Sequence, residues 1–189
     1  MCALTDPLNH WLSARKHPSL VITLILRYDI RVERKGAFVC IADGMRSGLP
    51  HGYFDIVFSI YGVGWTTDLD KTILLISEYL KPGGRVIFAW DNPLMQCITS
   101  QKEQYVLTRS YVAEEDILFC NNSEVCRQHN WKLSTYLNCL ADHGFLIERV
   151  VEESSYDEGE AAVFREGQYY SADRARLINP SFIVKARKC

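Results

Sequence analysis

The stretch Leu80-Lys-Pro-Gly-Gly-Arg-Val-Ile-Phe88 decides the fold of this 189-residue chain. Its Lys-Pro-Gly-Gly segment ends a helical pattern, because proline and glycine both interrupt helices. Residues 85–90 then read Arg-Val-Ile-Phe-Ala-Trp, which is typical of a strand. The stretch therefore predicts a helix, a tight turn and a strand in immediate succession.

The residues before this turn extend the pattern. Leu69, Ile73, Ile76 and Leu80 recur at helical spacing, so we expect one amphipathic helix here. Thr67, with Asp70 three residues later, forms a capping-box pattern at the start of that helix. A strand at residues 54–60 precedes it, followed by a loop at 61–65.

Strands and helices alternate over most of the chain. We expect an α/β domain whose mostly parallel sheet has helices on both faces. Residues 145–151 and 181–187 form two strands with no crossover helix between them, so these pair antiparallel. Residues 1–189 form a single domain, with a cap or insertion around 92–130. The further elements expected are a helix starting at Asp6-Pro7, strands at 20–26 and 37–41, and a helix at 131–143 that ends at Gly144.

Composition excludes several functions. Hydrophobic residues make up 48% of the chain and charged residues 23%, which is the balance of a soluble globular domain. A formal charge of −2 gives no general attraction to nucleic acid or to an anionic membrane. The longest apolar run, at residues 20–26, is far too short to span a bilayer. We therefore expect no nucleic-acid or membrane partner, while the oligomeric state stays open.

The cysteines indicate a reducing compartment. There are seven of them, with no Cys-x-x-Cys pair, and the spacing of Cys120 and Cys126 fits no common zinc motif. No secretory leader is visible at the N-terminus. We expect a cytoplasmic protein with mostly buried thiols and no metal.

Candidate ligand-binding residues follow the predicted strands, because open α/β sheets bind ligands at the carboxyl ends of their strands. Gly62-Val-Gly64 resembles the start of a dinucleotide fingerprint, but its third position is Thr67, where the next helix starts. A nucleotide-binding module is therefore the weakest functional class for this chain.

Three segments carry a family resemblance, in order and spacing: residues 42–50, residues 53–59 and the Leu80–Phe88 stretch. Together they resemble the class I S-adenosylmethionine-dependent methyltransferases, most closely the small-molecule, type 11-like group. The resemblance covers roughly residues 37 to 188. It implies a Rossmann-like sheet, S-adenosylmethionine as the cofactor and a small molecule as the methyl acceptor.

The resemblance also implies roles for individual residues. Asp43 would contact the adenine amine, Gly44 and Met45 would lie along the base, and the cofactor's sulfonium side would be lined by Ser59, Ile60 and Tyr61. The acceptor pocket would be formed by Trp90, Asp91 and the 92–130 segment. His129 is either an acceptor-site base or a histidine at a helix entry. No residue is assigned to catalysis, since the sulfonium is already activated and positioning supplies most of the rate.

The chain departs from the family's pattern at its N-terminal side. The family places a glycine-rich loop after its first strand, and this chain has no glycine before Gly36. The family's acidic residue at the end of the second strand is expected near Ile25, which is apolar. We therefore expect the first strand to be missing. Two functions remain open: a methyltransferase, or a truncated or degenerate methyltransferase-like domain without catalysis that serves as a binding or interaction module.

Overall fold

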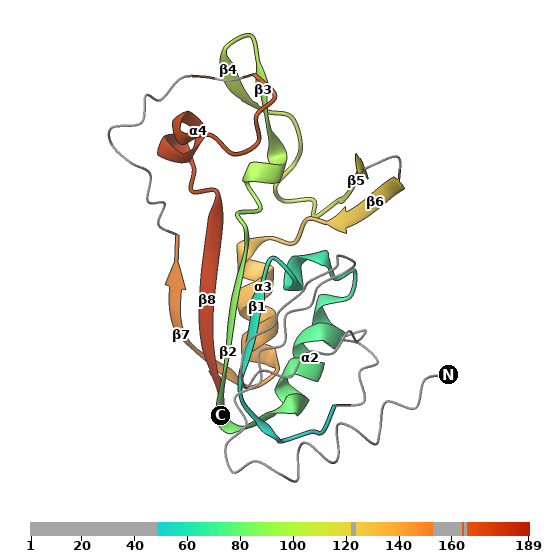
Figure 1. Cartoon of the computed structure of the whole chain (residues 1–189), viewed down its shortest axis with the longest axis vertical. Helices are drawn as coiled ribbons and strands as arrows, with labels where there is room; N and C mark the ends of the chain where they lie inside the picture. The colour runs from blue at the N-terminus through green and yellow to red at the C-terminus, as the bar shows by residue number, and fades with distance from the viewer. Residues whose placement is uncertain (1–48, 122–123, 153–163, 165) are drawn as a thin grey trace, which may run out of the picture.

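The structure is a computed structural model that describes residues 49–121, 124–152, 164 and 166–189 (Figure 1). The first part of the chain forms β1 (Phe54–Ile60), the 3-10 turn η1 (Val63–Trp65), α2 (Leu69–Tyr79), β2 (Leu80–Asp91), η2 (Met95–Cys97), β3 (Ile98–Gln101) and β4 (Gln104–Leu107). The second part forms β5 (Asp116–Asn121), β6 (Glu124–His129), α3 (Leu133–Asp142), β7 (Phe145–Val151), α4 (Ala172–Leu177) and β8 (Ser181–Lys188).

The main sheet has the strand order β1-β2-β8-β7. β1 and β2 are parallel, while β8 is antiparallel to both of its neighbours. The expected antiparallel pairing of the last two strands is confirmed, and the structure adds that β8 inserts between β2 and β7. The strands expected at 20–26 and 37–41, and the helix at Asp6, lie outside the described residues.

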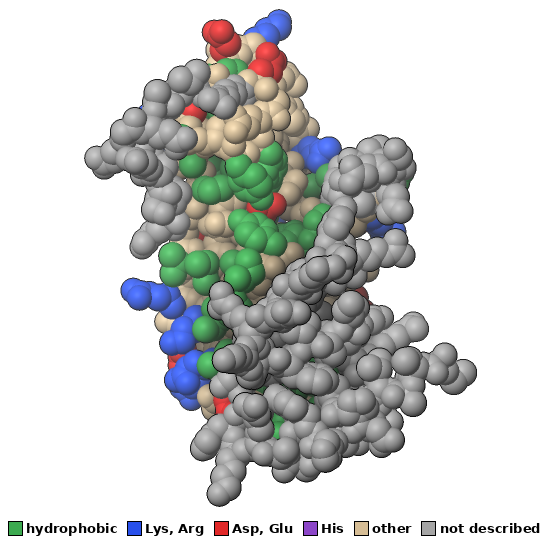
Figure 2. Space-filling model, in the orientation of Figure 1, with side chains coloured by type: hydrophobic (Ala, Val, Ile, Leu, Met, Phe, Trp, Pro, Cys, Tyr) green, Lys and Arg blue, Asp and Glu red, His purple; other side chains and the backbone are tan. Residues whose placement is uncertain are grey.

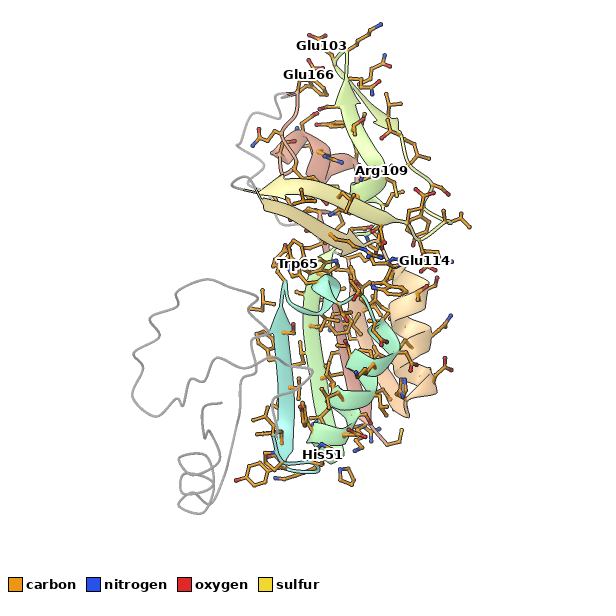
Figure 3. All side chains as sticks on the ribbon, turned by 90° about the vertical axis from the view of Figure 1, so that its right-hand side faces the viewer. His51, Trp65, Glu103, Arg109, Glu114 and Glu166 are labelled. Carbon is orange, nitrogen blue, oxygen red and sulfur yellow. The ribbon has the colours of Figure 1, made fainter. Side chains whose placement is uncertain are left out.

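Helices α2 and α3 cover one face of this sheet (Figures 1 and 3). Alternate residues of the central strands point into the core beneath them, among them Val86 and Phe88 of β2 and Val184 of β8, all fully buried. Tyr136 and Leu140 of α3 meet them from the helix side. The helical periodicity of residues 69–80 and 131–143 is thus confirmed as a core-facing pattern.

The Lys-Pro-Gly-Gly stretch, predicted as a tight turn, instead lies in the first residues of β2, which follows α2 directly and pairs irregularly with β1 there. Gly83 adopts a φ of +77°, a conformation that side chains with a Cβ rarely adopt. Lys81 pairs with Asp55 of β1, with Nζ 2.9 Å from Oδ1. At the other end of α2 the prediction is wrong by one residue: the N-cap is Asp68, which accepts a hydrogen bond from Lys71 N, and Thr67 is not the cap.

The segment between β2 and α3 forms two hairpins, β3–β4 and β5–β6, which stand beyond the end of the main sheet (Figure 1). α4 lies beside the first hairpin, and its cap is Ser171. This helix was not expected, because six residues carry too short an apolar pattern to detect. No helix in the described part of the chain has the length and hydropathy to cross a membrane.

Candidate functional site

The carboxyl ends of β1 and β2 meet at the end of the sheet that faces the two hairpins (Figure 1). Tyr61 N donates to Ala89 O at 2.9 Å, which extends the parallel pairing one residue past β1. The side chains of Ile60 and Tyr61 are exposed here, at 49% and 42%. Tyr61 has a φ of +51°, a strained conformation for a tyrosine, and such strain clusters at functional sites.

The loop after β1 is fixed from below. Ser59 is buried, and its Oγ accepts the N–H of Val63 at 3.1 Å, so this side chain holds η1 in place. Gly64 lies against the indole of Trp90, and a Cβ at Gly64 would overlap that ring. Trp90 is 4% exposed and packs edge-on to Trp65, with ring centroids 5.6 Å apart. Trp90 therefore belongs to the core. Its ring lies beneath that of Tyr61, with the two ring centroids 6.0 Å apart.

Asp91 is the last residue of β2 and carries a buried carboxylate, only 8% exposed. The Tyr170 hydroxyl donates to its Oδ1, and Gln96 Nε2 donates to its Oδ2 at 3.4 Å. Burial raises the pKa of Asp91 above its ordinary value, although the hydrogen bond from Tyr170 opposes this. A carboxylate of this kind is suited to binding a cation or a hydrogen-bond donor.

A buried arginine attaches the segment that carries Tyr170 to the backbone of η2 and β3. Arg174 of α4 is 4% exposed and donates from Nη2 to the carbonyls of Met95 and Ile98, at 2.8 and 2.7 Å. Its guanidinium also lies over the ring of Tyr169, 5.0 Å from the centroid. The helix that follows Tyr170 is thereby anchored to the start of β3.

His129, the last residue of β6, is held by a carboxylate from β5. Its Nδ1 lies 2.7 Å from Asp116 Oδ1, and its ring packs on Trp131 with centroids 4.0 Å apart. This contact lowers the pKa of Asp116, with a further contribution from Arg127. An imidazole held at one nitrogen by a carboxylate has a fixed orientation, as general bases require.

The His129 region adjoins the loop after β1. β6 contacts η1, and Trp131 Nε1 donates to Thr66 O at 3.2 Å. Figure 3 shows Trp65 of η1 at the level where the β5–β6 hairpin meets the end of the sheet. The same figure shows Glu114 above the start of α3. The backbone N–H of Lys132, the N-cap of α3, donates to the Glu114 carboxylate at 2.9 Å. The described part of the candidate site thus lies between the ends of β1 and β2 and this hairpin.

The structure brings some of the predicted site residues together. Ile60, Tyr61, Trp90 and Asp91 gather at one end of the sheet, with Ser59 beneath them. Asp43, Gly44 and Met45 lie outside the described residues. The sequence analysis covered Gln96 and Asp116 only within the 92–130 segment, without singling them out, and it missed Tyr170. Only the Tyr169-Tyr170 pair before a serine-capped helix gave a local signal for any of them.

Comparisons with known proteins agree with this architecture. Residues 25–88 match the family model of a methyltransferase domain, Methyltransf_11. A search of the curated proteins finds no match. Among solved structures, a Listeria monocytogenes protein classed with the S-adenosylmethionine-dependent methyltransferases aligns with a TM-score of 0.66 and 15% identity, over 84% of this chain and 72% of that one. An S-adenosylmethionine-dependent methyltransferase from Mesorhizobium loti aligns with a TM-score of 0.62 and 21% identity, over 83% and 72%.

A methyltransferase from Methanosarcina mazei is similar at lower overlap, with a TM-score of 0.51 and 15% identity over 80% of this chain and 67% of that one. The chain therefore has the Rossmann-like α/β fold of the class I S-adenosylmethionine-dependent methyltransferases, and the predicted resemblance and fold class are confirmed. The expected absence of a first strand concerns residues outside those described.

Proposed function

We propose that this chain is an S-adenosylmethionine-dependent methyltransferase that acts on a small molecule. The observation that carries the proposal is the buried carboxylate of Asp91 at the end of β2, beside the strained Tyr61 at the end of the parallel strand β1. Ligands of open α/β sheets bind at this edge.

The described residues suit a cofactor that carries a positive sulfonium. The Asp91 carboxylate offers opposite charge, and the exposed ring of Tyr61 offers an aromatic face, both of which favour a cation. Ile60 and Tyr61 would lie along the sulfonium side, with Ser59 fixing their loop from below. Bound there, the cofactor supplies an activated methyl group. Asp43, Gly44 and Met45 would hold the adenine end.

The acceptor would lie between Asp91 and His129, over the floor formed by Trp90. Asp91 would accept a hydrogen bond from the nucleophilic hydroxyl or amine and so orient it. A nitrogen or oxygen nucleophile sheds a proton when it is methylated. His129 would take up that proton, because Asp116 holds its Nδ1 and the ring is thereby oriented.

Binding of the cofactor is the first test. Calorimetric titration of the full chain with S-adenosylmethionine should give a saturable binding isotherm, and Asp43→Ala should weaken it. The absence of heat or of any thermal shift at millimolar cofactor would overturn the enzyme proposal and favour the non-catalytic module. An unchanged affinity in Asp43→Ala would refute the adenine assignment alone.

Turnover is the second test. Release of S-adenosylhomocysteine is followed while a panel of small phenols, amines, thiols and carboxylic acids is offered. His129→Asn and Asp116→Asn should each lower kcat by about 10²-fold or more, the usual contribution of general-base catalysis, while cofactor binding stays intact. Equal turnover in wild type and His129→Asn would exclude His129 as the proton acceptor.

A further inference from the structure

A second cluster of chemically active side chains lies between α2 and α3, on the helical layer. Asp70 from the first turn of α2 meets Cys139 of α3 and His143 at the C-cap of α3 there, and one ligand atom from each residue lies within 4.8 Å of the other two. Cys139 lies in the last turn of α3, and His143, four residues later, is the C-cap residue of that helix. These are an oxygen, a sulfur and a nitrogen donor, the set that zinc prefers.

The two α3 donors are held in place by the end of the helix. His143 N donates to Cys139 O at 3.2 Å, and Ser77 Oγ of α2 donates to His143 O at 3.4 Å. The side chain of His143 is 16% exposed, whereas that of Asp70 is 78% exposed and contacts His143 Nε2. Two donors are therefore preorganised, and the third can adjust to an ion.

Negative charge surrounds the cluster. Burial, together with the nearby carboxylates of Asp70, Asp142 and Asp68, raises the pKa of the Cys139 thiol to about 11. Such surroundings oppose a free thiolate but favour one that is neutralised by a divalent cation.

We propose that Asp70, Cys139 and His143 form a binding site for a borderline-soft divalent cation, zinc in the first place, that ties α2 to α3. Three protein donors leave the fourth tetrahedral position to water. On binding, the Cys139 S–H bond gives its proton to solvent and the thiolate sulfur bonds the metal. His143 donates the lone pair of Nε2 and keeps its proton on Nδ1.

One contact must open for the ion to enter. His143 Nε2 now lies 2.7 Å from Asp70 Oδ1, whereas two donors of one tetrahedral zinc ion are separated by about 3.4 Å. A small rotation of the exposed Asp70 side chain provides this distance. Affinity should rise with pH, since the thiol proton is released. The charged groups that face Cys139 are Asp70 of α2 and its N-cap Asp68, with Asp142 of α3 and its C-cap His143.

Cobalt(II) is the probe, because a cobalt–thiolate bond gives a charge-transfer band in the near ultraviolet. The chelator-treated, reduced full chain is titrated with Co²⁺, and its thermal midpoint is recorded with and without Zn²⁺. We expect a band that saturates at one ion at this site and a higher midpoint with zinc. Cys139→Ser should abolish both, while Cys189→Ser, at the exposed C-terminus, should keep both.

The variants His143→Asn and Asp70→Asn distinguish a site with three donors from binding by the Cys139 thiolate alone. Each should weaken Co²⁺ binding at least tenfold while the metal-free protein remains folded by circular dichroism. A band that survives in Cys139→Ser would overturn the proposal, because other thiols would then hold the ion. Unchanged affinity in both His143→Asn and Asp70→Asn would overturn it as well.

Discussion

The hydroxyl of Tyr170 donates a hydrogen bond to Oδ1 of Asp91, although the two residues are 79 positions apart in the sequence. This contact joins the segment before α4 to the carboxyl end of β2. Burial raises the pKa of both groups, and the Tyr170 pKa is raised further by its bond to Asp91. The Tyr170 hydroxyl thus remains a proton donor toward the carboxylate at neutral pH.

Tyr170→Phe removes the hydrogen bond that favours ionised Asp91. The pKa of Asp91 should therefore rise, and the acid limb of the kcat/KM profile should move up by about one pH unit, since a hydrogen bond to a charged group contributes about 1.5 kcal/mol. Tyr105→Phe is the matched change, because its hydroxyl contacts Asp173 at 3.1 Å and not Asp91. A pH profile identical to wild type in Tyr170→Phe would contradict this role.

Gly64→Ala should displace the indole beneath the site. An added Cβ would lie 1.7 Å from Trp90 Cε2, so the ring must move. Overpacking of this kind costs about 1–3 kcal/mol, which urea unfolding measures, and tryptophan fluorescence should shift with it. Combining Gly64→Ala with Trp90→Phe should recover part of the loss, because the smaller ring leaves room. A single variant as stable as wild type would disprove the packing argument.

Arg174→Lys should loosen the segment that carries Tyr170. A lysine cannot reproduce the guanidinium that reaches Met95 O and Ile98 O together, so buried carbonyls lose their donors. We expect a loss of about 2 kcal/mol or more in the free energy of unfolding. Arg176→Lys, on an exposed position of the same helix, should change it by less than about 0.5 kcal/mol. Equal losses in the two variants would argue against the anchor.

Glu148 on β7 forms ion pairs with three cationic side chains, namely Arg85 of β2 and Lys185 and Arg187 of β8. The hydrogen bonds from Lys185 and Arg85 lower its pKa from 4.5 to about 2. A depressed carboxylate pKa stabilises the fold above pH 4.5, and this contribution disappears as the pH falls toward 2. Figure 2 shows Lys and Arg side chains gathered beside a band of hydrophobic side chains on the face of the molecule in view.

Glu148→Gln tests this contribution. The difference in thermal midpoint between wild type and variant should be greatest above pH 4.5 and shrink as the pH falls toward 2. Glu103→Gln, on the turn between β3 and β4, is the matched substitution away from the network. A difference that stays constant down to pH 2 would show that the network does not titrate with folding.

The sequence alone determined the local elements of the main sheet. The Lys-Pro-Gly-Gly stretch identified the change from α2 to β2, because proline and glycine both interrupt a helix. Helical spacing found α2 and α3, because a buried helix face repeats every 3.6 residues. The predicted strand at 145–151 is confirmed without change as β7. All of these signals are contained within about ten residues.

Only the tertiary structure decided which distant segments and side chains come together at the candidate site and between the helices. It set β8 between β2 and β7, brought Tyr170 to Asp91, and held His129 with Asp116. Lys188 shows the same limit, because its Nζ donates to the carbonyls of Ser77 and Leu80 at the end of α2, far away in the sequence. Local patterns record which face of a segment is buried, but not which distant segment covers it. Polar partners 13 to 111 residues apart are chosen by the packing of whole elements, and no periodicity in the chain encodes that choice.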